Sequence, residues 1–405
     1  MSKVAEKALA RLLGLAENAA CRVSGDADAP RVVSLRFSEA SFADYLQLPT
    51  YAAKAECNGL LQLAERAGAI LIDWDTRAAA GSRVDRIAVA DKAKLAEAVG
   101  VIPRWEHVTQ AELAFQEHQQ RHPVLLEVLS AWRRGVQARG TKAGDIADWL
   151  NAVTVVDACR ARVGQDVPVR RLSASMFADS KRIEGLSPVV DALVTGTLTG
   201  LSRDAEEVFA EIGLVKFPPT FLLAGDLTFD VGGQLVQSVR PYIGLSPHAI
   251  SSVRCAPGTW CVLTVENLTT FHELVARASE CPGLVIAYTG GMPSPSWKRA
   301  FAILVAALPV GARCSHWGDV DAGGFRIASH IAGVCEQAGF RLELHVMAIE
   351  VSDVGIVRKV LSNPEVAEIE RICRRWGWEA ECAAIAVTRA AVEQESLPVS
   401  WPLGD

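Results

Sequence analysis

Apolar residues recur at every third or fourth position over residues 3–19, and this period predicts an amphipathic helix near the start of the chain. A short β-branched run at residues 31–36 predicts a strand, and helical patterning returns over residues 38–63. Residues 68–75 then read as a strand, and residues 87–90 have the composition of its return partner. The first part of the chain is therefore expected to combine helices with a two-stranded hairpin.

The polar segment of residues 103–123 is rich in Gln, Glu and His and is bracketed by prolines, which predicts a joint between domains near residue 120. Beyond it, two helices, a short strand, a charged turn and a further helix are predicted at residues 124–139, 142–162, 169–175, 178–182 and 187–198. Short strands around Gly232-Gly233 predict a second hairpin. Helices followed by a hairpin give the outline of a winged helix in both regions.

From residue 258 onward, strands and helices alternate regularly. Apolar strands are predicted at residues 260–265, 284–288, 313–317 and 341–347, with helical patterns between them. Such alternation is typical of βαβ units, whose strands run parallel in one sheet. The C-terminal part is therefore expected to be an α/β domain.

Three carboxylates are predicted at the carboxyl ends of two of these strands. Glu266 follows the first strand, and Asp319 and Asp321 follow the third. Because the ligands of an open α/β sheet bind at the carboxyl ends of its strands, the three side chains are expected to converge on one rim. Crowded carboxylates call for a neutralising cation, and Mg²⁺ or Mn²⁺ favours oxygen ligands. Gly323 and Gly324 leave room for a phosphate or a metal-bound water at the start of the next helix.

Composition predicts a folded chain. Half of the 405 residues are apolar and 22% are charged, close to the globular average, and the longest apolar run, of eleven residues, is too short to cross a membrane. The first residues lack the apolar core of a secretion signal. The ten cysteines occur singly, which predicts small buried hydrophobes in a reducing compartment. The protein is therefore expected to be cytoplasmic, without a membrane span or a disulfide framework.

Charge is distributed unevenly along the chain. The net charge is −6, yet residues 131–182 hold ten Lys and Arg against five Asp and no Glu. This excess could attract the phosphates of DNA, or it could belong to a solvated helix face. The expected DNA-binding residues are Arg170, Arg171, Lys181 and Arg182. Lys181 could also bind the scissile phosphate, or lie in a turn exposed to solvent.

Five short segments resemble one known family. They are Glu266-Asn-Leu-Thr-Thr-Phe271, Tyr288-Thr-Gly-Gly291, His316-Trp-Gly-Asp-Val-Asp-Ala-Gly-Gly324, Ala178-Asp-Ser-Lys181-Arg182 and Glu393-Gln-Glu395. The carboxylate pattern resembles the Toprim domain, the Mg²⁺-binding unit of topoisomerases, primases and several nucleases. The whole set resembles the JetD family, the nuclease subunits of the Wadjet plasmid-defence systems. That family has glycine where this chain has Ala178, a change that a turn with negative φ tolerates.

The resemblance implies an architecture, because the JetD family is similar to the topoisomerase VI A subunit. It implies a multidomain α/β and α+β protein with winged-helix domains followed by Toprim. The expected domains are an N-terminal helical and winged-helix-like domain at residues 1–122, a middle winged-helix (CAP-like) domain at residues 123–255 and a Toprim catalytic domain at residues 256–405.

The resemblance also implies an activity and partners. It implies a DNA endonuclease, dependent on Mg²⁺ or Mn²⁺, that hydrolyses circular plasmid DNA. Such an enzyme acts as a homodimer and works with condensin-like SMC and kleisin subunits. Glu266, Asp319 and Asp321 are the expected metal ligands, and together with Lys181 they are the expected catalytic residues.

Two other functions remain open. A topoisomerase VI A-like subunit needs a tyrosine nucleophile upstream of Toprim, and residues 52–241 contain none. The four tyrosines of the chain are Tyr45, Tyr51, Tyr242 and Tyr288. Water is therefore the expected nucleophile, and His316 is expected to be a strand residue rather than a base. The second alternative is a DNA-binding scaffold subunit that keeps the fold without catalysis, and the three carboxylates disfavour it.

Overall fold

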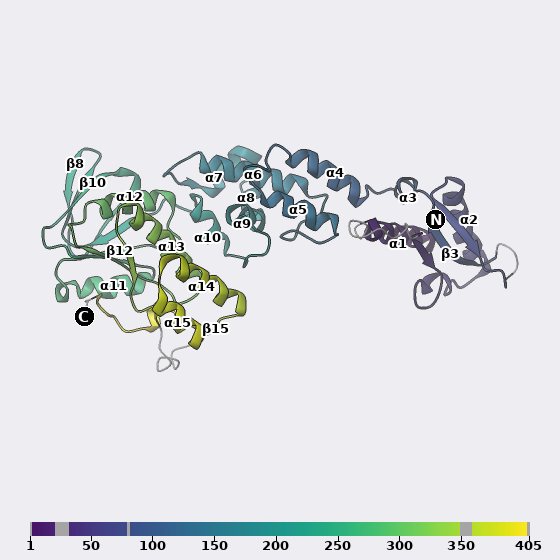
Figure 1. The fold of residues 1–405 in the computed structure, drawn as a ribbon. Coiled ribbons are helices and arrows are strands. Elements are labelled where there is room, and N and C mark those ends of the chain that lie inside the picture. The colour runs from purple at the N-terminus through teal and green to yellow at the C-terminus, as the bar shows by residue number, and fades with distance from the viewer. Residues whose placement is uncertain (1, 21–31, 79–81, 349–358, 403–405) are drawn as a thin grey trace. The chain divides into compact units, whose positions relative to one another are not determined.

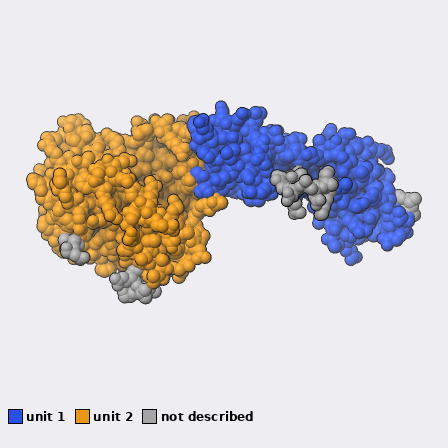
Figure 2. Space-filling view, in the orientation of Figure 1, with its two compact units in different colours: residues 1–151, 196–198 blue, residues 152–195, 199–405 orange. Residues whose placement is uncertain are grey.

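The computed structural model of the chain describes residues 2–20, 32–78, 82–348 and 359–402. Its helices and strands form a mixed α/β structure with both parallel and antiparallel pairs (Figure 1). The contacts cluster into two compact units, one of residues 1–151 and 196–198 and the other of residues 152–195 and 199–405 (Figure 2). The three domains expected from the sequence stay a prediction.

The first unit begins with α1 (Lys3–Ala20), which confirms the first predicted helix. The elements that follow are β1 (Ser34–Arg36), η1 (Ala43–Tyr45), α2 (Tyr51–Arg66), β2 (Ile70–Trp74), β3 (Val84–Val89) and α3 (Lys92–Val99). The strands pair antiparallel in the order β1-β3-β2, so the predicted hairpin is present. The buried Tyr45 hydroxyl donates to Asn58 at 2.8 Å and accepts the N–H of Val84 at 3.0 Å. It thereby joins α2 to β3.

Helices form the next stretch of the chain. They are α4 (Arg104–Phe115), α5 (Val124–Arg133) and α6 (Ile146–Arg160). Helix α4 therefore lies inside the segment that was expected to be a joint. The buried rings of Phe115, Trp132 and Trp149 pack in a row, with centroids 6.0 and 6.4 Å apart, and so connect the three helices.

The strand predicted at residues 169–175 is wrong, because these residues form helix α7 (Val169–Phe177). Val169, Leu172 and Ser173 are buried, and their spacing of three and one fits a helix face, while Arg170 and Arg171 are exposed. The β-branched run was too short to distinguish the two periods. The elements around α7 are β4 (Val167–Pro168), α8 (Arg182–Gly185), α9 (Ser187–Thr195), α10 (Ala205–Glu211) and β5 (Leu214–Val215).

The turn between α7 and α8 corrects a second expectation. Ala178 has φ +55° and ψ 18°, the left-handed conformation that favours glycine, whereas the sequence reading assumed a negative φ. The buried Ser173 hydroxyl donates to the Asp179 carbonyl at 2.5 Å and accepts the N–H of Ile183 at 3.1 Å. These two bonds fix the turn, so alanine is held in a strained backbone conformation.

A six-stranded mixed sheet forms the centre of the second unit, in the order β14-β13-β11-β12-β6-β9. The strands β11 (Cys261–Val265), β12 (Leu284–Tyr288), β13 (Arg313–Trp317) and β14 (Leu342–Leu344) run parallel, as predicted. The strands β6 (Phe221–Ala224) and β9 (Ile243–Leu245) extend the sheet antiparallel beyond β12. The sequence did not place these two strands in the sheet.

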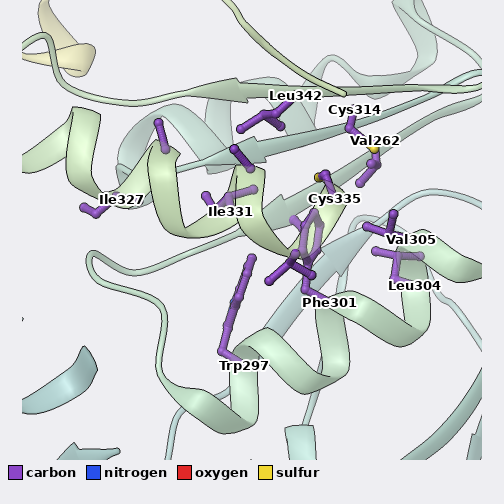
Figure 3. Packing of buried hydrophobic residues seen from close by; sticks show 14 of the residues in the cluster. Val262, Trp297, Phe301, Leu304, Val305, Cys314, Ile327, Ile331, Cys335 and Leu342 are labelled. Carbon is purple, nitrogen blue, oxygen red and sulfur yellow. The ribbon is translucent and has the colours of Figure 1, made fainter. Parts of the chain in front are cut away.

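Successive side chains of a strand point to opposite faces of the sheet, and both faces of this sheet are apolar. Helices therefore pack on both faces. Val262 joins the core made by α12 (Pro295–Ala306) and α13 (Ala322–Gln337). Figure 3 shows side chains from these two helices gathered against β11, β13 and β14. The neighbouring residues Leu263 and Val265 belong instead to the core on the side of α11 (Leu268–Ala276).

The remaining elements flank the sheet. The strands β7 (Leu227–Val231) and β8 (Gln234–Gln237) form the predicted hairpin at Gly232-Gly233, and β10 (Ile250–Cys255) pairs with β7. The last elements, which the sequence reading did not predict, are α14 (Asn363–Trp376), α15 (Glu379–Thr388), β15 (Lys359–Val360), β16 (Ala390–Ala391) and η5 (Gln394–Ser396).

Two expectations from composition concern the whole chain. Nine of the cysteines lie in the described residues, where they are unpaired and seven are buried. Across those same residues, the structure has no helix that is both long and apolar enough to cross a bilayer.

Candidate functional site

The carboxyl ends of β11 and β13 bring Glu266 and Asp319 together. The two strands are parallel neighbours with Val265 opposite Trp317, so the residues that follow them start from the same edge of the sheet. The Glu266 N–H donates to the Trp317 carbonyl at 3.2 Å, and the Asp319 N–H donates to Glu266 Oε2 at 3.3 Å. Glu266 is therefore bonded directly to the backbone of the loop that carries both aspartates.

Asp321 lies at the start of α13 and caps that helix. Its Oδ1 accepts the N–H of Gly324 at 2.8 Å, which satisfies one of the free donors of the first turn. A Cβ atom at Gly324 would stand 2.1 Å from the Asp319 carbonyl oxygen, so only glycine fits there. We refer to Glu266, Asp319 and Asp321 as the acidic rim.

The pKa values of two rim carboxyl groups are raised. Burial, followed by the charge of Asp319, raises the pKa of Glu266 to about 8. Burial also raises the pKa of Asp319 to about 6, with further contributions from Glu393 and Asp321. Negative charge at the rim is therefore poorly compensated by the protein itself, which is the electrostatic condition that a cation would relieve.

The rim carboxylates are near one another but are not arranged around a common point. Across residues 2–20, 32–78, 82–348 and 359–402, no three His, Cys, Asp or Glu side chains already form a metal-binding set. The oxygens that Asp319 and Asp321 use for structural bonds are Oδ1 in both cases. Each bonded oxygen keeps a second lone pair, so these structural bonds are compatible with a bound ion.

A segment distant in sequence is hydrogen-bonded to the rim. Residues 392–395, which we call the clasp, lie beside the loop after β13, and Val392 and Val320 exchange backbone hydrogen bonds. Gln394 is fully buried, and its backbone N–H donates to Asp319 Oδ1 at 2.6 Å. Its side chain donates to the Trp317 carbonyl at 2.9 Å and accepts the N–H of Asn267 at 2.7 Å. One glutamine thus holds the ends of both strands.

Two glutamates flank this glutamine at the rim. The Glu393 side chain is hydrogen-bonded to Asp319 and contributes to its raised pKa. Glu395 accepts a hydrogen bond from the Asn267 side chain at 3.1 Å. In the sequence, Glu393-Gln-Glu395 is recognisable only as a family-like motif without a role, because nothing in the local pattern indicates contact with residues 266–319.

A buried ion network lies behind the rim and ties several helices together. Its centres are two arginines, Arg203 before α10 and Arg326 on α13, whose side chains are 5% and 15% exposed. The pairs are Arg203 with Asp191 at 2.6 Å, Arg203 with Glu211 at 2.5 Å, Arg326 with Glu207 at 2.9 Å and Arg326 with Glu368 at 3.1 Å. The charge of Glu207 also contributes to the raised pKa of Glu266. The charges of the network therefore contribute to the electrostatic potential at the rim.

The predicted DNA-binding residues lie on α7 and in the turn after it, within what we call the basic arm, residues 169–185. Arg170, Arg171 and Lys181 are exposed, and Arg182 is partly buried. Arg170 pairs with Glu184 at 3.1 Å across the surface. No contact in the described part of the chain joins Arg170 or Lys181 to the acidic rim, and DNA binding by the four basic residues stays a prediction.

Two tyrosines belong to the sheet region. Tyr242 packs edge-on against Phe271 and His272, as expected for a packing residue. Tyr288 ends β12, and burial together with the charge of Glu266 raises the pKa of its hydroxyl. Tyr288 therefore lies close enough to the rim to sense its charge, and it keeps its proton at neutral pH.

These features define a class: an α/β protein whose parallel strands end in a site of carboxylates. Residues 246–339 match the model of a family described as the C-terminal part of the Wadjet protein JetD. The match confirms the resemblance that the sequence segments indicated, so this part of the chain is similar to the C-terminal part of JetD proteins. It contains the whole acidic rim, whereas the clasp and the basic arm lie outside it. No curated protein matches the chain significantly.

Proposed function

We propose that the protein is a metal-dependent DNA endonuclease of a Wadjet plasmid-defence system. The observation that carries the proposal is the acidic rim, in which partly buried carboxyl groups at two adjacent strand ends have pKa values raised to about 8 and about 6. A stable protein rarely keeps such groups together without a use for them. The match of the same region to the JetD family supports a role in plasmid defence.

The donor set of the rim fits a hard divalent cation. Glu266, Asp319 and Asp321 would hold Mg²⁺ or Mn²⁺, which prefer carboxylate oxygens. When bound, such an ion polarises a phosphodiester and lowers the pKa of a coordinated water. Glu266, with a pKa near the working pH, is suited to accept a proton from the attacking water. The clasp would keep the Asp319 carboxyl in place during this step.

The remaining parts of the proposal concern DNA and assembly. The basic arm would hold the phosphate backbone, because the carboxylates of the rim repel it. One rim per chain cuts one strand, so a twofold dimer is the simplest way to cut both strands. Light scattering at concentrations that support cleavage tests this, and a monomer there would contradict it. SMC and kleisin subunits are the partners that the family implies.

The alternatives differ in what they need from the rim. A scaffold subunit needs no ionisable rim at all, so neutral rim variants would leave it functional. A strand-passing subunit needs a tyrosine nucleophile, and Tyr288 retains its proton beside a carboxylate that would oppose its ionisation. Hydrolysis by water is the reaction that the described residues support best.

Metal-dependent nicking of supercoiled plasmid tests the proposal. Glu266→Gln, Asp319→Asn and Asp321→Asn should each lower the nicking rate by at least about a hundredfold, as expected when a general base or an ion ligand is lost. Asn at 321 is preferable to Ala because it keeps the oxygen that caps α13, and loss of that cap costs about 1 kcal/mol.

The matched control is Glu343→Gln. Glu343 lies on the neighbouring strand β14 and pairs loosely with Arg313 at 3.6 Å, away from the strand ends. This variant should nick DNA at the wild-type rate. If Asp319→Asn does the same, the rim is not the catalytic site and the scaffold function takes its place.

A further inference from the structure

His316 is a buried histidine on β13, three residues before Asp319. Its ring is completely buried, and Nδ1 lies 2.9 Å from the Thr264 hydroxyl on β11. The other ring nitrogen, Nε2, is also buried and has no hydrogen-bond partner in the described structure. Leaving a buried polar atom unpaired costs about 1–3 kcal/mol, so such an atom calls for an explanation.

The position of Nε2 links it to the acidic rim. A Cβ atom at the buried Gly318 would stand 2.7 Å from His316 Nε2 and 2.7 Å from Glu266 Oε2. Both atoms therefore face the same small space beside Gly318. Any side chain at that position would displace one or both of them, which explains why glycine occupies it.

The hydrogen bonds of Thr264 decide which ring nitrogen carries the proton. Its hydroxyl has one hydrogen, and it lies 3.2 Å from the Ser315 carbonyl, which can only accept. Both contacts of Thr264 form together only if the hydroxyl donates to Ser315 and Nδ1–H of His316 donates to the hydroxyl. Nε2 then presents a lone pair. Burial lowers the pKa of His316 to about 3, so the ring is neutral.

A lone pair and a carboxylate oxygen that face one space both need a donor there. We propose that His316 is a positioning residue of the rim: its Nε2 accepts a hydrogen bond from a water molecule that also donates to Glu266 Oε2. This arrangement fixes the orientation of the carboxyl group that, under the proposed function on which this inference rests, binds the metal ion. Groups that orient metal ligands in this way typically change metal affinity by about 10–100-fold when removed.

Titration of the metal-free protein with Mn²⁺, followed by calorimetry, tests the role of Nε2 without any cleavage assay. His316→Phe and His316→Asn should each lower the Mn²⁺ affinity by about 10–100-fold. Asn keeps a donor at the place of Nδ1, and so keeps the bond to Thr264, but has nothing at the place of Nε2. His316→Gln has an acceptor at the place of Nε2 and should bind Mn²⁺ more tightly than the Asn variant.

A purely structural role predicts the opposite order, with Asn close to the wild type and Gln weak. His345→Gln is the control, since the His345 ring packs on Trp317 and bonds the Ser400 carbonyl at 3.1 Å rather than a rim residue. It should leave Mn²⁺ binding unchanged. Thermal unfolding of each variant separates loss of binding from loss of fold.

The outcomes distinguish this inference from the proposed function. If the wild type binds Mn²⁺ and His316→Asn binds it equally well, or if Asn and Gln are equally weak, His316 does not position the rim and the metal site stands. If the wild type itself binds no Mn²⁺, the metal site is wrong and the role of His316 is wrong with it.

Discussion

The acidic rim and the basic arm place opposite charges in opposite kinds of surroundings. The rim carboxylates are partly buried, and backbone amides from Asp319, Gly324 and Gln394 hold them. Arg170, Arg171 and Lys181 of the basic arm are exposed, and the ion pair between Arg170 and Glu184 lies at the surface. This difference fits the functions proposed for the two regions. A proposed catalytic carboxylate has to be held precisely and is bonded to the backbone, whereas a side chain proposed to attract phosphate can be long and exposed.

The largest effect that separates the two regions concerns stability. Arg203→Met removes the centre of the buried network behind the rim and leaves Asp191 and Glu211 without their cation. Breaking a buried pair from one side costs about 3–5 kcal/mol, so the free energy of unfolding should fall by that amount. Urea denaturation measures the loss.

Arg170→Met is the matched control for Arg203→Met on the basic arm. It breaks an exposed pair of 3.1 Å, and such pairs contribute about 0–1 kcal/mol. If the two variants lost the same free energy of unfolding, the buried network would contribute no more to stability than the exposed pair, which would contradict the proposed difference between the two regions.

The second difference is in pH dependence. The folded state holds the Glu266 proton more tightly than the unfolded state does, because the pKa is about 8 in the fold and ordinarily 4.5. Ionisation of Glu266 therefore destabilises the fold, and the stability of the metal-free protein should fall as pH rises from about 4.5 to about 8. The pKa of Asp319 is about 6, so its ionisation lowers stability mainly at pH values below about 6.

The measurement is the Tm of metal-free protein at pH 6.5 and pH 8.5. The wild type should lose at least about 2 °C more than Glu266→Gln, which corresponds to roughly 1 kcal/mol in a domain of this size. Saturating Mg²⁺ should abolish the difference, since a bound cation favours the ionised carboxylate. Parallel curves without metal would show that Glu266 is not perturbed.

The basic arm is expected to contribute to the salt dependence of DNA binding. Neutralising Arg171 and Lys181 together, both to Gln, should lower the slope of log affinity for duplex DNA against log salt by about two, if both contact phosphate. Fluorescence anisotropy over a salt series gives the slope. Arg170→Gln should change the slope by less than one, because Glu184 already compensates its charge. An unchanged slope in the double variant would assign the arm to a solvated surface.

The smallest expected effect is at the strained turn of the arm. Ala178→Gly should stabilise the protein by about 0.5–1 kcal/mol, because glycine adopts the left-handed conformation without the penalty that alanine incurs. Chemical denaturation against the wild type detects it. Ala174→Gly, on the exposed face of α7, should destabilise by a similar amount, since glycine weakens a helix interior. A loss at both positions would show that Ala178 is not strained.

The three rim residues could be predicted from the sequence, whereas the residues that hold them in place could not. Glu266, Asp319 and Asp321 were predicted to meet because strand ends and parallel order follow from local hydrophobic patterns. The clasp contacts depend on residues 75 to 128 positions apart, and no local pattern encodes such a contact. The same holds for the network around Arg203 and Arg326, whose partners lie on several helices.

The errors in the fold have local causes. The run Val169-Arg-Arg-Leu-Ser-Ala-Ser is short enough to fit both a strand and a helix, and burial of Leu172 and Ser173 on one face decided for the helix. The strand β6 was recognisable only as part of a hairpin segment, and β9 was not predicted, because their antiparallel pairing beyond β12 is set by the tertiary structure. The four parallel strands were predicted correctly, since their apolar runs are separated by helices of ordinary length.

The position of Gln394 in the chain sets an order of events during synthesis. Translation proceeds from the N-terminus, so Glu266 and Asp319 leave the ribosome well before the glutamine that bonds the Trp317 carbonyl and Asp319 Oδ1. A nascent chain therefore contains the basic arm and the parallel strands before Gln394 can form its hydrogen bonds to the rim. The backbone and side-chain bonds of Gln394 to the rim can form only after residue 394 has been synthesised, so the rim is completed later than the parallel strands that carry it.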